Sequence, residues 1–309
     1  MSTDALQPQV AAIAQRHGLD GVPARRYAGG SVPVYALGTQ HVLKLYPPQD
    51  RTHAQVEARV LAFVDGRLPL PTPQVVAGGE WDDGSYLLMT QLRGHLLVDV
   101  WPQLAPAERD SLCQGIGEAV ATLHALDSQA LADLPPPHWA QFITSQRHGA
   151  VARQRRYGLA DAWLEQIEPF LQRWAGAANA QQVLLHTEIM REHLLVQPAG
   201  SGWRLSGLFD FEPAMRGARE YEFASIGLFV SGGDARALRC ILRAYGYAEV
   251  ALDNALQNRL MAMALLHRYS KLPWYLQRLP LPGAQRLEQL AAHWWKLRPD
   301  EPPFQRRQT

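Results

Sequence analysis

Short apolar runs broken by turn residues dominate the first part of the chain, and they predict strands. Residues 32–37 (VPVYAL) and 42–46 (VLKLY) lie on either side of Gly38, an arrangement typical of a β-hairpin. Residues 75–76 and 86–89 are two more such runs, joined across the turn-forming sequence Gly-Gly-Glu-Trp-Asp-Asp-Gly. We therefore expect a small antiparallel sheet near the N-terminus.

Apolar residues at helical spacing interrupt this strand pattern and later replace it. Residues 53–64 predict one helix, and three prolines within residues 68–73 must end it. From Gly94 onward helical spacing prevails, and residues 107–125 predict a helix whose buried stripe consists of Leu112, Ile116, Val120 and Leu123. Further helical patterns cover residues 160–175, 234–246, 252–271 and 284–297.

One strand-rich island, residues 182–211, lies inside the helical half of the chain. It contains three short apolar runs, at residues 183–185, 194–196 and 205–209. We find no internal repeat. The patterns divide the chain into a small sheet-rich N-lobe, residues 1–93, and a large helical C-lobe, residues 94–309, that encloses a buried hairpin.

Composition narrows the class of protein without naming a function. The 30 Lys and Arg residues nearly balance 29 acids, so nothing global indicates a nucleic-acid or membrane partner. No segment approaches the roughly 18 apolar residues of a spanning helix. The first residues show no basic start followed by an apolar run, so we expect no secretion signal, and Cys113 and Cys240 have no metal or redox spacing. We expect a cytoplasmic protein with reduced thiols.

Gly29, Gly30 and Ser31 precede the predicted hairpin and are candidates for an anion cradle. Paired glycines let main-chain N–H groups approach an anion without a Cβ in the way. The alternative is an ordinary turn.

Lys44 lies in the middle of an apolar strand, where its ammonium requires an anionic partner. Glu57, on the following helix, is placed to orient it. The alternative is a lysine at a sheet edge that extends to water.

Polar and titratable residues gather between two apolar runs, where a simple core would exclude them. The segment reads HTEIMREHLLV from His186 to Val196, and Phe209-Asp210-Phe211 follows. It resembles the HGDxHxxNxxx catalytic loop, followed by a strand ending in Asp, of the aminoglycoside phosphotransferase and choline-kinase superfamily. The layout is most similar to hygromycin-type phosphotransferases.

The resemblance implies a role for each matching residue. Glu188 matches the catalytic aspartate, His193 the metal-binding asparagine and Asp210 the second metal ligand. His186 matches the histidine at the foot of the loop, which implies a structural brace rather than a base. Lys44, oriented by Glu57, is then expected to hold nucleotide phosphates above the glycines. Mg²⁺ and ATP or GTP are the implied metal and co-substrate.

Other segments extend the resemblance over roughly residues 25 to 225. Residues 86–89 with Thr90, Gln91 and Leu92 resemble the last N-lobe strand and the adenine-binding hinge. Leu123-His124 is similar to the paired Leu-His of the C-lobe helix, and GAREYEFA, residues 217–224, to the GDPxYDLA stretch. The implied fold is α+β and bilobal, protein-kinase-like, with a small antiparallel-sheet N-lobe and a large, mostly helical C-lobe.

Three departures from the family pattern bear on the chemistry. Glu188 keeps a carboxylate but adds a methylene, and a misplacement of about 1 Å can cost about a hundredfold in rate. His193 offers nitrogen where Mg²⁺ prefers oxygen, and it either contacts the metal or donates to a phosphate. Ala218 and Arg219 replace Asp-Pro, with Glu220 and Glu222 nearby to take over hydrogen bonding.

Arg191, inside the loop, is a candidate for adding positive charge near the transferring phosphoryl group. Its alternative is a solvated side chain or a pair with Glu192.

The resulting hypothesis is an O-phosphotransferase that uses ATP or GTP to phosphorylate a small hydroxylated acceptor, possibly an antibiotic. The alternative from another class is a catalytically silent nucleotide-binding pseudokinase or regulatory module. A protein kinase is disfavoured because no segment ending in Ala-Pro-Glu follows Asp210. Residues 223–299 hold four acids against ten Lys or Arg, which favours an acceptor less cationic than an aminoglycoside.

Overall fold

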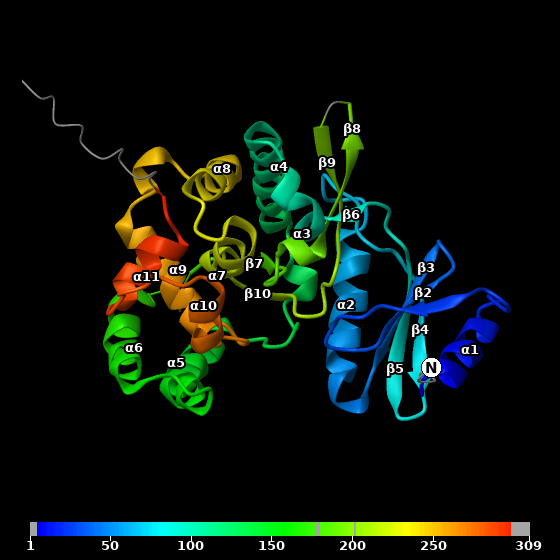
Figure 1. Ribbon diagram of the computed structural model, residues 1–309. Coiled ribbons are helices and arrows are strands. Elements are labelled where there is room, and N and C mark those ends of the chain that lie inside the picture. Colours follow the sequence, from blue (N-terminus) through cyan, green and yellow to red (C-terminus); the bar gives the residue numbers. More distant parts are fainter. Residues whose placement is uncertain (1–4, 177–179, 201, 298–309) are drawn as a thin grey trace, which may run out of the picture.

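A five-stranded antiparallel sheet in the order β1-β2-β3-β5-β4 forms the N-terminal lobe (Figure 1). The computed structural model describes residues 5–176, 180–200 and 202–297. The hairpin predicted around Gly38 is confirmed as β2–β3, with Val34 opposite Lys44. The strands are β1 (Ala24–Arg26), β2 (Val34–Leu37), β3 (His41–Tyr46), β4 (Val75–Trp81) and β5 (Gly84–Thr90).

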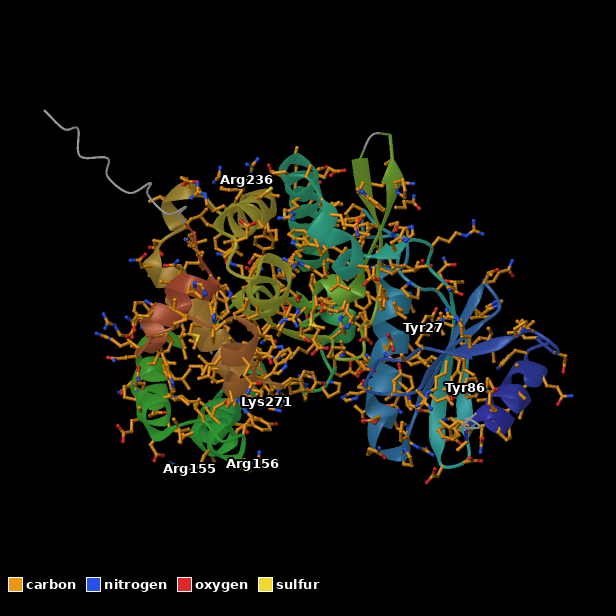
Figure 2. All side chains as sticks on the ribbon, viewed as in Figure 1. Tyr27, Tyr86, Arg155, Arg156, Arg236 and Lys271 are labelled. Atoms are coloured by element: carbon orange, nitrogen blue, oxygen red, sulfur yellow. The ribbon has the colours of Figure 1, made fainter. Side chains whose placement is uncertain are left out.

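Alternation along β3 sends its side chains to opposite faces of this sheet. Leu43 and Leu45 pack on the face covered by α1 (Gln7–Arg16). Tyr86 of β5 lies on the same face (Figure 2), with its hydroxyl 2.8 Å from His17 Nε2. The intervening residues Lys44 and Tyr46 therefore face α2 (Arg51–Val64), the helix predicted over residues 53–64.

The C-terminal lobe is mostly helical and lies beside the sheet (Figure 1). Four of its helices match predicted periodicities: α4 (Pro106–Ala125), α6 (Asp161–Trp174), α8 (Ala235–Tyr245) and α11 (Leu287–Trp294). The prediction over residues 252–271 ran too far, because α9 (Asn254–Leu266) ends before His267. Residues 298–309 of the predicted lobe lie outside the described part of the chain, and the lobe boundary at residue 93 remains a prediction.

Several short or polar elements were not predicted from the sequence. The helix α5 (Trp139–Arg156) buries few positions, so its apolar stripe is too sparse to read. The short helix α10 (Leu272–Arg278), which has a proline in its first turn, was not recognised from the sequence. Other unpredicted elements include α1, β1, α3 (Leu97–Val100) and α7 (Glu220–Ser225). No helix among the described residues is both long and apolar enough to span a membrane.

Two small sheets in the C-terminal lobe present the chain segments that matter for function. The predicted strand-rich island is confirmed: β8 (Leu194–Ala199) pairs with β9 (Gly202–Leu208) and with β6 (His95–Leu96). The strand β7 (Gln182–Leu185) pairs instead with β10 (Met215–Ala218), which was not predicted. The β7–β8 and β9–β10 connections consequently lie close together, facing the N-terminal sheet.

Close packing of α4 against α8 depends on a glycine. A Cβ built at Gly117 would lie 2.3 Å from the main-chain oxygen of Ile241 and 2.7 Å from Ala244 Cβ. No side chain fits there without moving one helix away from the other.

We expect Gly117→Ala to lower the free energy of unfolding by about 1–3 kcal/mol, because the added methyl overpacks a helix contact. The matched control is Gly149→Ala in α5, where a Cβ meets nothing within 4 Å. That change should instead raise helix stability by about 0.5–1 kcal/mol. Chemical denaturation of both variants checks the pair, and equal effects would contradict the packing argument.

Candidate active site

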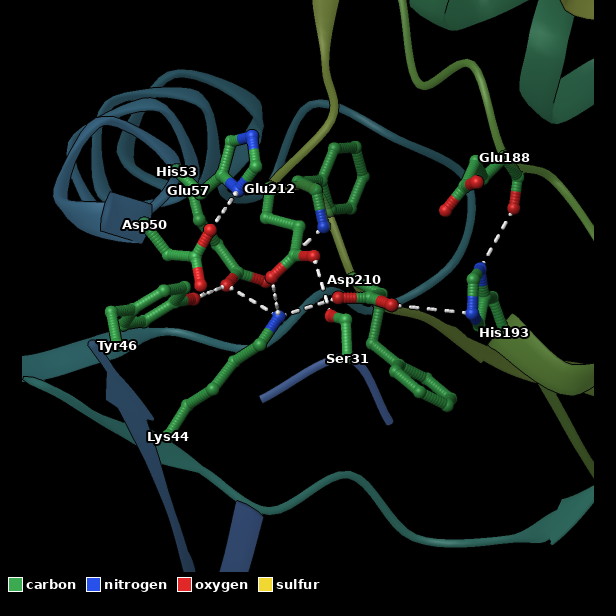
Figure 3. A network of polar contacts seen from close by, with 12 residues as sticks. Ser31, Lys44, Tyr46, Asp50, His53, Glu57, Glu188, His193, Asp210 and Glu212 are labelled. Carbon is green, nitrogen blue, oxygen red and sulfur yellow. Dashed lines mark hydrogen bonds and ion pairs between the residues drawn. The ribbon is translucent and has the colours of Figure 1, made fainter. Parts of the chain in front are cut away.

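The Lys44 ammonium is the centre of a buried charge cluster (Figure 3). Its Nζ lies 3.0 Å from Glu57 Oε2, 2.5 Å from Asp210 Oδ1 and 2.8 Å from Glu212 Oε2. The Tyr46 hydroxyl, on the same face of β3, donates to Glu57. The structure thus brings Lys44, Glu57 and Asp210 together from β3, α2 and the β9–β10 connection.

These contacts determine the charge states in the cluster. Burial by itself would lower the pKa of Lys44, but the facing carboxylates of Glu57 and Asp210 raise that pKa well above its ordinary value. Burial alone would raise the pKa of Asp210, but the charges of Lys44 and His193 together lower that pKa to about 2. At neutral pH the site therefore holds an ammonium against an ionised aspartate.

Glu212 is a member of the cluster that the sequence reasoning missed. Phe211 points into the core, while Asp210 and Glu212 on either side of it both reach Lys44. The Phe211 N–H also donates to Glu57 Oε1 at 3.2 Å, which ties α2 to this segment. Strand alternation does not account for this shared direction, because Asp210 has a φ of 72° and Glu212 lies in a turn.

The β7–β8 loop is held from below by one buried carboxylate. Glu222 accepts the N–H of His186 at 2.7 Å and that of Thr187 at 2.9 Å. Thr187 has a φ of 74°, a backbone conformation that costs a non-glycine residue about 1–3 kcal/mol. Those two charge-assisted hydrogen bonds, each worth roughly 1.5–3 kcal/mol, offset that strain. Glu222 is thus the nearby carboxylate that supplies the loop's hydrogen bonding.

His186 connects this loop to the Asp210 segment. Its Nδ1 accepts from the Glu188 N–H at 3.3 Å, so Nε2 carries the proton and donates to Phe209 O at 3.0 Å. Burial lowers the pKa of His186 to about 4, which keeps the ring neutral. Both nitrogens are committed to main-chain groups, an arrangement that suits a brace and not a base.

Glu188 and His193 face Asp210 from the other side of the site (Figure 3). Burial raises the pKa of Glu188 to about 7, with nearby Asp210 adding to the effect and His193 opposing it. The His193 Nδ1 lies 2.8 Å from the Glu188 main-chain oxygen, and its Nε2 lies 3.2 Å from Asp210 Oδ2.

Two groups of side chains in the described chain have donor atoms close enough to share a metal ion. They are Glu188, His193 and Asp210, and Glu57, Asp210 and Glu212, each with its donor atoms within 4.8 Å of one another. The second group already surrounds the Lys44 ammonium. The first group is therefore the one whose geometry fits a divalent ion.

The glycine loop lies over the same cluster. Gly30 has a φ of 116°, which favours glycine, and Ser31 Oγ donates to Glu212 Oε1 at 3.0 Å. A cavity of about 330 Å³ is lined by residues 26–33, so the loop borders open space. The Ser31 contact with Glu212 puts this loop next to the Lys44 cluster.

The predicted hinge follows β5, and two of its main-chain N–H groups already form hydrogen bonds within the N-terminal lobe. The N–H groups of Thr90 and Gln91 donate to Gln74 O and Gln40 O, at 2.9 and 2.7 Å. Within the described residues the Leu92 N–H donates to no other group.

Arg191 does not join the cluster, so the expectation of a catalytic arginine is corrected here. Its Nε donates to Val230 O at 2.8 Å, and its guanidinium lies 4.0 Å from the centroid of the Trp101 ring. Both contacts direct it into the C-terminal lobe, away from Asp210. Among the described residues Glu192 forms its ion pair with Arg278, at 3.3 Å, and not with Arg191.

Comparison with known proteins agrees with this geometry. The family model described as the phosphotransferase enzyme family matches residues 24–254, about three quarters of the chain. The chain belongs to that family. The match includes the glycine loop, Lys44, the β7–β8 loop and the Asp210 segment, so the sequence-based family resemblance is confirmed. None of the curated protein sequences matches this phosphotransferase.

Solved structures share its fold. An aminoglycoside 2'-phosphotransferase-IIIa in its GDP complex has a TM-score of 0.72 at 16% identity, over 94% of this chain and 98% of its own. The macrolide 2'-phosphotransferase of Brachybacterium faecium has a TM-score of 0.61 at 22% identity, over 95% and 99%. These likenesses confirm the bilobal, kinase-like α+β fold of the phosphotransferase.

We expect Glu222→Gln to destabilise the phosphotransferase by about 2 kcal/mol, because the two N–H groups bind different carboxylate oxygens and the amide puts an NH₂ donor in place of one of them and loses the charge. Hydrogen exchange at the His186 and Thr187 amides should accelerate accordingly. Glu220→Gln, two residues away and only loosely paired with Arg219 at 3.8 Å, should stay within about 0.5 kcal/mol of wild type. Similar losses in both variants would argue against the carboxylate clamp.

Proposed function

We propose that this phosphotransferase transfers the γ-phosphate of ATP or GTP to a hydroxyl of a small molecule. One observation carries the proposal: Lys44, Asp210 and Glu188, from three separate segments, converge on one site. Phosphoryl transfer needs a cation for the phosphates, oxygen ligands for a metal and a carboxylate for the acceptor hydroxyl. A protein core that serves packing alone would have no use for these three charged groups in one place.

Nucleotide binding follows from the N-terminal lobe. Lys44, oriented by Glu57, would exchange the carboxylates of Asp210 and Glu212 for phosphate oxygens, under Gly29, Gly30 and Ser31. The free Leu92 N–H, after Thr90 and Gln91, is the hinge donor for the base. Structures of this fold are described as complexes with GDP and with streptomycin and ATP, which supports a nucleoside triphosphate here.

Asp210 and His193 would hold a divalent ion, which neutralises phosphate charge when it is bound. Glu188 is the acceptor-side carboxylate, because it lies across the site from Lys44 and its pKa of about 7 suits proton acceptance near neutral pH. A carboxylate, an ammonium and Asp210 in one site favour turnover over the catalytically silent alternative.

Cationic and aromatic side chains within residues 268–278 are the candidates for the acceptor side of the site. The Arg268 guanidinium is near enough to oppose the rise in the Glu188 pKa. Tyr269, next in sequence, is 45% exposed, and Trp274 on α10 is 40% exposed. Arg278 lies 5.6 Å from the centroid of the Trp274 ring. These groups support an acceptor with less positive charge than an aminoglycoside.

The test of the proposal is nucleotide-dependent phosphorylation of a panel that spans cationic, neutral and aromatic hydroxylated antibiotics and metabolites. Wild type should phosphorylate at least one acceptor, and Asp210→Ala and Glu188→Gln should each lose at least about a hundredfold in kcat/KM. Arg155→Ala, at an exposed position of α5, is the control that should leave the rate unchanged. The proposal is rejected if no acceptor is phosphorylated and wild type, Asp210→Ala and Glu188→Gln hydrolyse the nucleotide at the same slow rate.

Glu188 makes the rate depend on pH. A carboxylate accepts a proton only when it is ionised, so kcat/KM should fall about tenfold per pH unit below its pKa and level off above it. Because the pKa of Glu188 is raised to about 7, the profile should bend near pH 7, at a higher pH than for an exposed glutamate. The pH–rate profile measures it. An acidic limb that persists unchanged in Glu188→Gln would assign the titration to another group.

A further inference from the structure

The orientation of the His193 ring is fixed by one main-chain contact. Its Nδ1 lies 2.8 Å from the Glu188 main-chain oxygen, which can only accept. The Nδ1 must therefore carry a hydrogen and donate. In the neutral ring the other nitrogen, Nε2, then presents a lone pair.

In the neutral ring that lone pair faces an oxygen of Asp210. The His193 Nε2 lies 3.2 Å from Asp210 Oδ2 (Figure 3), and Lys44 lies on the other carboxylate oxygen, Oδ1. A contact at this distance requires a positive charge between the two atoms, either a proton on Nε2 or a metal ion. Ligands at about 2.1–2.2 Å from a metal and at right angles to each other are about 3.0 Å apart, so the contact matches one edge of a coordination shell.

The arrangement also supplies the usual support of a metal-binding histidine. A ligating histidine normally donates its second ring N–H to a carbonyl or carboxylate, as Nδ1 does here. A carboxylate oxygen of Glu188 lies within 4.8 Å of the donor atoms of both His193 and Asp210, so the acceptor-side carboxylate is next to the ion.

We propose that His193 and Asp210 form a one-histidine, one-carboxylate site that selects Mn²⁺ over Mg²⁺, with Glu188 beside it as the acceptor-side carboxylate. The inference rests on the proposed function, because nucleotide phosphates would complete the coordination. Mg²⁺ requires hard oxygen ligands, whereas Mn²⁺ takes carboxylate and phosphate oxygens and lies in the series of ions that imidazole binds. Exchanging the imidazole for an amide oxygen would remove the preference.

The deciding experiment is a Mn²⁺ titration followed by electron paramagnetic resonance, with a non-hydrolysable ATP analogue and, in parallel, the GTP analogue. Mg²⁺ then competes for the bound ion. His193→Asn should weaken Mn²⁺ binding by about tenfold or more and let Mg²⁺ compete correspondingly better. His148→Asn, at an exposed position on α5, is the matched control and should match wild type. Equal Mn²⁺-to-Mg²⁺ ratios in wild type and His193→Asn overturn the proposal.

A second measurement needs no variant. In wild type, nitrogen coordination through Nε2 should produce a ¹⁴N coupling in the electron spin-echo modulation of the bound Mn²⁺. If that coupling is missing, His193 does not bind the ion and the proposal is overturned, even where His193→Asn fails to fold. The contact between His193 and Asp210 is then a hydrogen bond from a protonated ring.

The two proposals fail in different ways. Calorimetry of the same nucleotide analogues with Mg²⁺ reports nucleotide binding independently of metal choice. Absence of binding with either ion overturns the proposed function and this inference together. Nucleotide binding with no metal preference overturns this inference alone.

Discussion

The buried ammonium of Lys44 is the interaction on which the rest of the site depends. It joins β3, α2 and the β9–β10 connection through Glu57, Asp210 and Glu212. Breaking a buried ion pair by removing one partner leaves an uncompensated charge and costs about 3–5 kcal/mol. The two lobes therefore have a charge network in common, and a nucleotide entering the site would substitute its phosphates for carboxylates already present.

A second constraint positions the catalytic loop from beneath. Glu222 binds two successive main-chain N–H groups, and His186 links the same loop to Phe209 next to Asp210. Glu188 and Asp210 are thus placed by hydrogen bonds between loops and not by their own side-chain packing.

Local patterns were sufficient for the elements that hold the site. The period-2 alternation of β3 and the helical spacing after residue 53 put Lys44 and Glu57 on facing surfaces, and the structure joins them at 3.0 Å. The polar segment between two apolar runs located Glu188 and His193, and the end of the third run located Asp210. The helix α5 buries too few positions for its stripe to be recognised, and α10 is too short for a helical period to be read.

The sequence by itself determined the family, the order of the strands that flank the loop and the identity of the lysine and carboxylates. Those features follow from residue type and short-range spacing, which propensity and periodicity report directly. Only the tertiary structure decided that Glu212 reaches Lys44, that Arg191 is held by Val230 and Trp101, and that His193 points its Nε2 at Asp210. The direction of a loop side chain depends on partners distant in sequence, and no local pattern encodes them.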